Sequence, residues 1–220
     1  QDIAALIAAE GGGAPAAAVV AHDWGGAVAW NLANQHPALM QRLAILNSPH
    51  PGAFVRELRS SPEQQQASAY MNFLARPDAA ALLAQDDYRR LWPFFTSGPG
   101  GSAGAGWLTE TVKSQYRAVW RDGAGLVGGC HYYRASPLRP PTADDPGATA
   151  VDLPDEAVRV DVPTLVVWGL QDAALRPGLV EGLERWVPQL QLQRWPDASH
   201  WLVHEHPDWV TQEIAAFLAS

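Results

Sequence analysis

The sequence predicts an α/β fold, in which a mostly parallel sheet forms the core and a helical cap is inserted between two halves of that core. Two separated stretches alternate apolar runs with helical patterns, as parallel strands joined by helices do. The stretch between them, from about residue 54 to residue 133, carries only helical signals. We therefore assign residues 1–50 to the first part of the core, 51–155 to the cap and its linker, and 156–220 to the second part of the core.

Composition limits the possible partners of the chain. Its 220 residues are 47% hydrophobic and include 10 Trp, enough for one domain with a large core. Fifteen basic and 23 acidic residues give a net charge of −8, which disfavours nucleic acid and anionic membranes as partners. No apolar run reaches the roughly 20 residues of a membrane span, and the single Cys130 excludes an internal disulfide. We expect a cytoplasmic protein without a membrane span.

The first 50 residues predict the order helix, strand, helix, strand. Residues 2–10 have the pattern of an amphipathic helix, and three glycines end it. Residues 16–21 predict a buried strand, residues 27–36 a helix that a proline stops, and residues 42–47 a second buried strand. Only one strand precedes the turn after residue 21, and the chain does not begin with Met. We therefore expect the sequence to be a fragment in which the first strands of the core are missing.

The middle of the chain predicts helices between two irregular segments. A cluster of helix-breaking residues at 48–52 and a linker rich in Pro, Asp and Thr at 137–155 bound this region. A glycine-rich cap loop is expected at residues 98–106. The predicted cap helices cover residues 63–74, 79–83, 87–94, 109–121 and 124–134. Helices over the mouth of a sheet can close a pocket against water.

The α/β pattern returns after the linker. Residues 162–169 and 190–195 predict strands, and residues 179–186 and 208–218 predict helices. The two halves of the core together therefore supply several parallel strands. In open parallel sheets, sites lie at the carboxyl ends of the strands.

The most informative segment is residues 19–27, with the sequence VVAHDWGGA. It predicts a strand, a sharp turn and a helix, with Asp23 at the apex and small residues where strand and helix approach closely. A carboxylate attacks without a base to activate it, so Asp at the apex favours displacement at an alkyl carbon over acyl transfer. An Asp in this place is also a common helix N-cap, so its partners decide between the two interpretations.

Two residues later in the chain match the partners that such an Asp requires. A base must activate water to release the alkylated carboxylate, and His200 lies in the loop between the last predicted strand and helix. Asp172 follows the strand at 162–169 and is the candidate to orient His200. Asn47, at the end of an earlier strand, marks the alternative place for the orienting acid. The order Asp23, Asp172, His200 is nucleophile, acid, base.

These motifs resemble the α/β-hydrolase superfamily, and within it the epoxide hydrolase branch. The resemblance extends from Ile3 to Leu218. Residues 22–26 (HDWGG) resemble the nucleophile turn, 168–172 (WGLQD) the acid segment and 198–201 (ASHW) the base segment. It implies a small apolar epoxide as substrate, attack by Asp23, and no metal or organic cofactor.

The resemblance also implies two cap tyrosines that bind the epoxide oxygen. Tyr70 resembles the first and Tyr133 the second, although Tyr132 competes with Tyr133 because helical phase is uncertain from sequence. A phenol, with an ordinary pKa of about 10, can donate a proton to a leaving alkoxide. Trp24 and Trp107 are the candidates to line the substrate pocket.

The family's His-Gly-x-Pro segment, which supplies an oxyanion donor, has no match in residues 1–22. The N–H of Trp24 can supply one donor.

Two other functions stay open: a haloalkane dehalogenase, which also uses Asp followed by Trp, and a non-catalytic fragment that acts as a binding module. The remaining candidate histidines have no consistent metal spacing and are interpreted as structural or surface residues: His22, His50, His131, His204 and His206.

Overall fold

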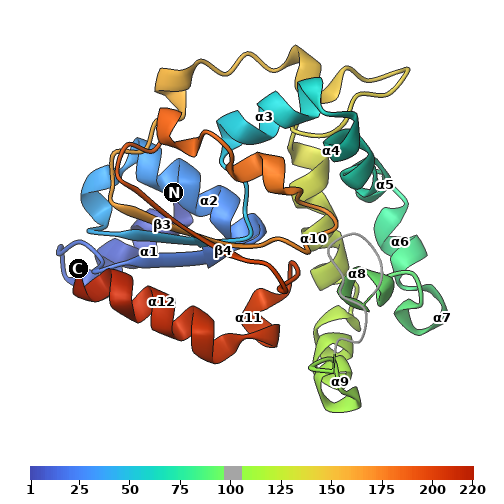
Figure 1. Ribbon diagram of the computed structural model, residues 1–220. Coiled ribbons are helices and arrows are strands. Elements are labelled where there is room, and N and C mark those ends of the chain that lie inside the picture. Colours follow the sequence, from blue (N-terminus) through green and yellow to red (C-terminus); the bar gives the residue numbers. More distant parts are fainter. Residues whose placement is uncertain (97–105) are drawn as a thin grey trace.

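The computed structural model describes residues 1–96 and 106–220, and its core is a parallel sheet (Figure 1). The strands lie in chain order, all pairs parallel: β1 (Val19–His22), β2 (Leu43–Leu46), β3 (Thr164–Gly169) and β4 (Leu190–Trp195). The predicted α/β class with an inserted helical region is confirmed. Because all four strands run the same way, their carboxyl ends meet at one edge of the sheet.

Alternating side chains of the strands form two cores on the two faces of the sheet. In β2, Leu43 and Ile45 pack in one core with Trp30 of α2 (Trp24–Gln35). The side chain of Leu46 packs in the other with Phe217 of α12 (Pro207–Ala219). Figure 1 shows α2 and α12 on opposite faces of the sheet. The period of two along a strand explains this division.

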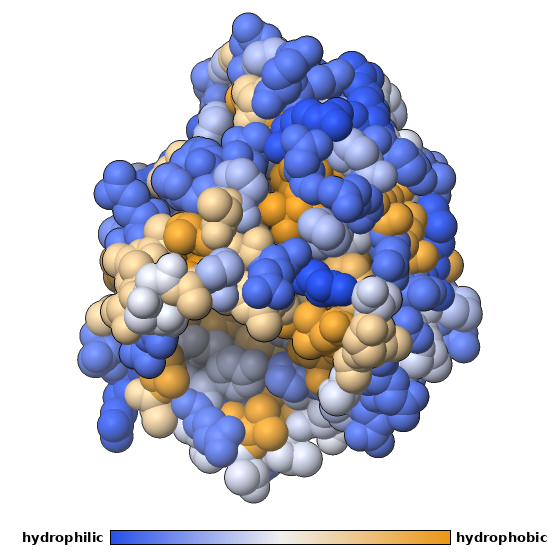
Figure 2. Space-filling view, turned by 90° about the vertical axis from the view of Figure 1, so that its left-hand side faces the viewer, coloured by the Kyte–Doolittle hydropathy of each residue, from blue (hydrophilic) through white to orange (hydrophobic). Residues whose placement is uncertain are grey.

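The first strand differs from its prediction. β1 begins three residues later than expected, and Val20 is 48% exposed instead of buried. Within the described residues β1 is one of the two edge strands, so it has a neighbour on one side only. Figure 2 shows one side of the molecule, on which apolar residues are interspersed with hydrophilic ones.

Apart from β1, the clearest difference from the predictions outside the cap lies between β3 and β4. α1 spans Asp2–Gly11, and the strands at 162–169 and 190–195 and the last helix lie where the sequence predicts them. The predicted helix at 179–186 is wrong. Two 3₁₀ turns replace it, η4 (Pro177–Val180) and η5 (Leu183–Arg185), because Gly182 between them has a φ of 69°. The remaining short elements are η1 (Pro37–Leu39), η2 (Gly147–Ala150), η3 (Asp155–Ala157) and α11 (Leu202–Glu205).

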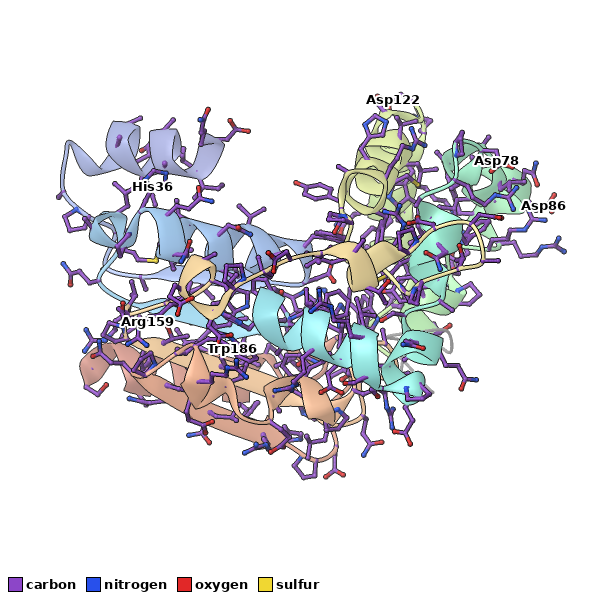
Figure 3. All side chains as sticks on the ribbon, turned by 90° about the horizontal axis from the view of Figure 1, so that it is seen from above. His36, Asp78, Asp86, Asp122, Arg159 and Trp186 are labelled. Atoms are coloured by element: carbon purple, nitrogen blue, oxygen red, sulfur yellow. The ribbon has the colours of Figure 1, made fainter. Side chains whose placement is uncertain are left out.

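Between residues 51 and 135 the described part of the inserted region consists of helices joined by short turns, and residues 136–146 are irregular. Its small core is formed by Leu74, Ala79, Leu83, Leu126 and Cys130. Figure 3 shows Asp78, Asp86 and Asp122 at the outer end of this region, away from the sheet. The helices are α3 (Pro51–Ser60), α4 (Pro62–Ala67), α5 (Tyr70–Leu74), α6 (Ala79–Leu83), α7 (Gln85–Tyr88), α8 (Pro93–Thr96), α9 (Glu110–Trp120) and α10 (Ala124–Ala135).

Two predicted cap helices are broken in the structure. The helix expected at 63–74 divides into α4 and α5 at Ser68 and Ala69, and the buried amide of Gln64 donates to the hydroxyl of Ser68 and the carbonyl of Ala174. The helix expected at 87–94 is wrong, because Asp87 and its two neighbours have positive φ. The cluster at 48–52 starts α3, since Pro51 occupies the first turn of that helix. The predicted loop at 98–106 lies almost entirely outside the described residues.

The helices of residues 1–96 and 106–220 are all too short or too polar to span a bilayer.

We predict that Gly26→Ala destabilises the protein, because the added Cβ would overlap the Cβ of Ser48 after β2. Overpacking of this kind costs about 1–3 kcal/mol. Gly128→Ala, on the exposed side of α10 with no atom within 4 Å of the added Cβ, serves as the control and should stabilise by about 0.5–1 kcal/mol. Chemical denaturation of both variants measures the difference. Equal stabilities would contradict the close approach of α2 to Ser48.

Candidate active site

Asp23 occupies a strained turn between β1 and α2. Its φ is 51° and its ψ is −128°, a conformation that non-glycine residues rarely adopt. The side chain of Asp23 makes no capping bond to α2, so the helix-cap interpretation is wrong. The carboxylate is 44% exposed and faces a cavity. The turn therefore presents a free carboxylate at the carboxyl edge of the sheet.

The structure brings Asp23, His200 and Asp172 together, with a ring nitrogen of His200 near each carboxylate. Nε2 of His200 lies 3.4 Å from Oδ1 of Asp23, and Nδ1 of His200 lies 2.7 Å from Oδ2 of Asp172. The side chain of His200 is 8% exposed and that of Asp172 is fully buried. One imidazole thus bridges an accessible carboxylate and a buried one.

The carboxylate of Asp172 is held by four N–H groups. The backbone N–H groups of Ala174 and Leu175 donate to Oδ1 at 2.9 and 2.8 Å. Asn47 Nδ2 and His200 Nδ1 both donate to Oδ2 at 2.7 Å. An ionised carboxylate only accepts hydrogen bonds, and this environment matches it. Asn47 thus donates to the carboxylate that contacts His200, and its amide oxygen accepts from the N–H of Gly169 at 2.8 Å.

The two carboxylates change the proton affinity of His200. Burial lowers the pKa of His200, but the charges of Asp172 and Asp23 and the hydrogen bonds to them outweigh burial and raise this pKa to about 10. Enclosure raises the pKa of Asp23, yet the hydrogen bond and charge of His200 outweigh it and hold the pKa of Asp23 below its ordinary value. The backbone N–H of Trp24, next in the chain, also lowers the pKa of Asp23.

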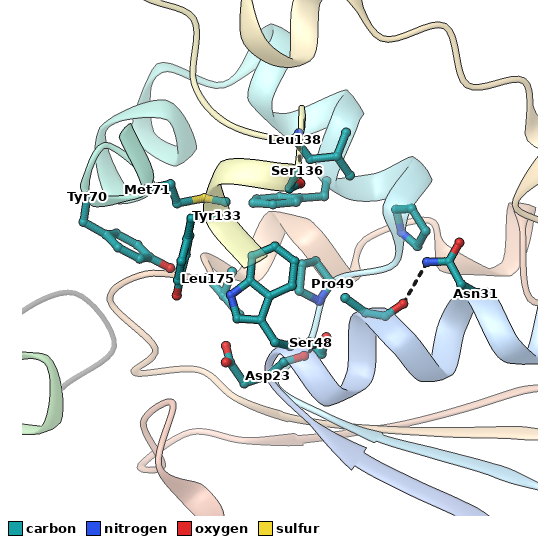
Figure 4. Close-up of a pocket in the computed structure, with 14 residues that line it drawn as sticks. Asp23, Asn31, Ser48, Pro49, Tyr70, Met71, Tyr133, Ser136, Leu138 and Leu175 are labelled. Atoms are coloured by element: carbon teal, nitrogen blue, oxygen red, sulfur yellow. Dashed lines mark hydrogen bonds between the residues drawn. The ribbon is translucent and has the colours of Figure 1, made fainter. Parts of the chain in front are cut away.

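Two tyrosines of the cap face Asp23. Figure 4 shows the hydroxyl groups of Tyr70 and Tyr133 directed toward each other and toward the carboxylate. Their ring centroids lie 6.0 Å apart at 72°. Burial raises the pKa of both phenols above the ordinary value, and the negative charge of Asp23 adds to the effect. Both hydroxyls are therefore protonated donors at neutral pH.

Two cavities meet at these groups, and Asp23, Trp24, Tyr70 and Tyr133 line both of them. The other residues around the first cavity are mainly apolar and include Phe54, Met71, Leu138 and Leu175 (Figure 4). His200 lines the second, beside aromatic residues of the cap. Among the described lining residues there is no Lys, Arg or Glu. Such walls suit a small uncharged ligand.

Two other residues that the sequence suggested, Tyr132 and Trp107, lie in different surroundings from Tyr70 and Tyr133. Tyr132 is 49% exposed, with its ring 5.3 Å from Trp24, so geometry favours Tyr133 as the second tyrosine. Trp107 does not line either cavity with Asp23: it stacks on His204 at 4.3 Å and packs against Trp201. The expectation that Trp107 contacts substrate is therefore not supported, because Trp201 lies nearer to His200.

Residues 1–96 and 106–220 contain no group of three or more acidic, His or Cys side chains arranged for a metal.

Sequence patterns did not single out the residues that hold the base loop in place, which is the segment of residues 196–201 that carries His200. Ser199 donates to the carboxylate of Glu205 through its N–H at 2.8 Å and its hydroxyl at 2.7 Å. On the other side of the loop, His22 Nε2 lies 2.8 Å from the carbonyl oxygen of His200. Adjacency of His22 to Asp23 was the only signal in the sequence that could have singled it out.

Comparisons with known proteins agree with this geometry. The family described as alpha/beta hydrolase fold matches residues 2–207. The crystal structure of Bacillus megaterium epoxide hydrolase in complex with an inhibitor is similar over 100% of this chain and 74% of that chain, with a TM-score of 0.85 and 30% identity. The chain belongs to the alpha/beta hydrolase fold family, and its resemblance to epoxide hydrolases is confirmed.

Two curated relatives are longer than this chain. The AB hydrolase superfamily protein YfhM of Bacillus subtilis (strain 168) is 32% identical over 203 residues, which cover 92% of this chain and 65% of YfhM. Epoxide hydrolase 1 of Caenorhabditis elegans is 30% identical over 212 residues, which cover 95% of this chain and 49% of the relative. The chain thus spans about half to two thirds of their length.

We predict that Asp172→Asn lowers the pKa of His200 from about 10, since it removes a carboxylate charge and its hydrogen bond to Nδ1. An NMR titration of the His200 ring measures the change. Asp152→Asn, at an exposed position in the linker, is the control and should leave that titration unchanged. A His200 that still titrates near 10 in the Asp172→Asn variant would show that Asp172 does not set its proton affinity.

Proposed function

We propose that this protein hydrolyses epoxides to vicinal diols through a covalent alkyl ester on Asp23. The observation that carries the proposal is the meeting of three groups at one cavity: a free carboxylate, a histidine bridged to a buried carboxylate, and two phenol hydroxyls opposite. The similarity to proteins named epoxide hydrolases supports the same reaction. With it we propose a small apolar epoxide as substrate, a cap comprising residues 51–155, and a cytoplasmic location.

In the first step, an oxygen of the Asp23 carboxylate attacks one epoxide carbon. The bond from that carbon to the epoxide oxygen breaks, and the oxygen takes a proton from the hydroxyl of Tyr70 or Tyr133. Both phenols have raised pKa values, so they hold their protons until alkoxide charge develops. The product of this step is a hydroxyalkyl ester on Asp23.

In the second step, His200 activates a water molecule that attacks the carbonyl carbon of the ester. Before the ester forms, the charge of Asp23 and its hydrogen bond both raise the pKa of His200. Esterification removes both, so the pKa of His200 falls. His200 thereby loses one proton when the ester forms, and this proton restores the phenol that protonated the alkoxide. His200 then takes a proton from the attacking water, whose hydroxide adds to the ester carbonyl. The bond from that carbon to the alkyl oxygen breaks, and the proton of the added hydroxyl goes to this oxygen, so the diol leaves and Asp23 is again a carboxylate. The N–H of Trp24, beside the Asp23 carboxylate, supplies one donor to the oxyanion.

The same geometry disfavours the haloalkane dehalogenase alternative. A departing halide needs no proton, whereas two protonated phenols facing Asp23 match an alkoxide leaving group. Assays that compare diol formation with halide release separate the two activities. A protein that turns over neither substrate would favour the binding-module alternative.

The covalent intermediate can be trapped by removing the base. In a His200→Gln variant, ring opening proceeds and ester hydrolysis fails, so the intact protein should gain the full mass of the epoxide. Mass spectrometry after incubation with styrene oxide measures the adduct and locates it on Asp23. The matched control is Asp23→Ala with His200 intact, which should form no adduct. An unmodified His200→Gln protein that still forms diol would contradict covalent catalysis.

Removal of either cap hydroxyl should slow ring opening. We expect Tyr70→Phe and Tyr133→Phe each to reduce the rate of ester formation by about 10²-fold, since each removes a donor to the developing alkoxide. Tyr132→Phe, which alters the half-exposed neighbour on the same helix, should retain the normal rate. Rapid-quench measurement of ester formation tests all three. A loss in Tyr132→Phe without one in Tyr133→Phe would exchange the roles of the two residues.

A further inference from the structure

The side chain of His22, at the end of β1, contacts the base loop, which is the segment of residues 196–201 after β4 that carries His200. His22 is the last residue of β1, directly before Asp23. Its Nε2 atom lies 2.8 Å from the carbonyl oxygen of His200, which is 178 residues later in the chain. A carbonyl oxygen only accepts hydrogen bonds, so Nε2 must carry the proton and donate it.

This hydrogen bond joins the two sides of the sheet. β1 and β4 are the outer strands of the described sheet, and the loop that carries His200 follows β4. The rings of His22 and His200 lie 4.8 Å apart at 43°, so the two side chains also pack together. The contact therefore connects the turn after β1, which carries Asp23, to the loop after β4, which carries His200.

The ring of His22 is suited to a neutral donor role. Burial and the nearby charge of His200 lower the pKa of His22 to about 4. At neutral pH the ring is uncharged and adds no positive charge beside the base. The hydrogen bond is therefore the main electrostatic contribution of His22 to the site.

We propose that His22 is a positioning residue, which holds the backbone of His200 so that the base faces the ester carbonyl on Asp23; this inference rests on the proposed function. Ester formation needs only the carboxylate and the tyrosines, whereas ester hydrolysis needs Nε2 of His200 in place for water. The Ser199–Glu205 contacts anchor the loop independently. Loss of the His22 hydrogen bond should therefore displace the base without unfolding the loop, and a displacement of about 1 Å can cost 10²-fold in rate.

The test measures the two half-reactions separately in His22→Leu and His22→Gln. In His22→Leu, ester hydrolysis should slow by about 10- to 100-fold while ester formation changes by less than about threefold, so the alkyl-enzyme accumulates during turnover. His22→Gln retains an N–H at a similar reach and should recover most of the hydrolysis rate. Rapid-quench mass spectrometry with styrene oxide follows both steps.

The controls separate this inference from the proposed function. His131→Leu, at an exposed position on α10, should leave both half-reactions unchanged. Normal ester hydrolysis in His22→Leu, or an equal loss in both half-reactions, would overturn the positioning role and leave the covalent mechanism intact. A wild-type protein that never forms the ester would overturn the mechanism itself. If His22→Leu does not fold, His22→Gln is compared with His22→Asn, whose side chain is shorter. The His22→Asn variant should hydrolyse the ester more slowly, and equal rates would overturn the inference.

Discussion

The site depends on one constraint, that a single imidazole must contact two carboxylates that differ in exposure. His200 lies 2.7 Å from the buried Asp172 and 3.4 Å from the accessible Asp23. The buried carboxylate has four N–H donors and is fixed, so the position of the imidazole is fixed with it. Asp23 is the partner whose charge changes when an ester forms. The constraint thus links the proton affinity of His200 to the charge of Asp23.

The parallel sheet makes this arrangement possible. Asp23 follows β1, Asn47 follows β2, Asp172 follows β3 and His200 follows β4, so all four lie at the same edge. Short hydrogen bonds across that edge align the loops: Asn47 donates to Asp172 and accepts from the N–H of Gly169, and His22 donates to the carbonyl of His200. The cap contributes the opposite wall, with two protonated phenols.

Local sequence patterns were sufficient to predict the three groups at the strand ends. An apolar strand followed by small residues placed Asp23 at a turn, and the strand pattern before Asp172 placed it at the same edge. The break at Ser68 was not predicted from the sequence; it lies beside a contact of Gln64 with Ala174, 110 residues later, which local patterns do not reveal. The supporting roles of Asn47 and His22 likewise arise from distant contacts. Trp107 was misplaced because an aromatic residue carries no local signal of the cavity it faces.

The central claim is that Asp23 bonds covalently to the substrate carbon, and a single turnover in heavy-oxygen water tests it most directly. If water attacks the ester carbonyl, the heavy oxygen enters the carboxylate of Asp23, and the first diol released carries only ordinary oxygen. Peptide mass spectrometry of the segment containing Asp23 should then show one heavy oxygen. Label that appears in the first diol and never in Asp23 would mean that water opens the epoxide directly, which contradicts the account.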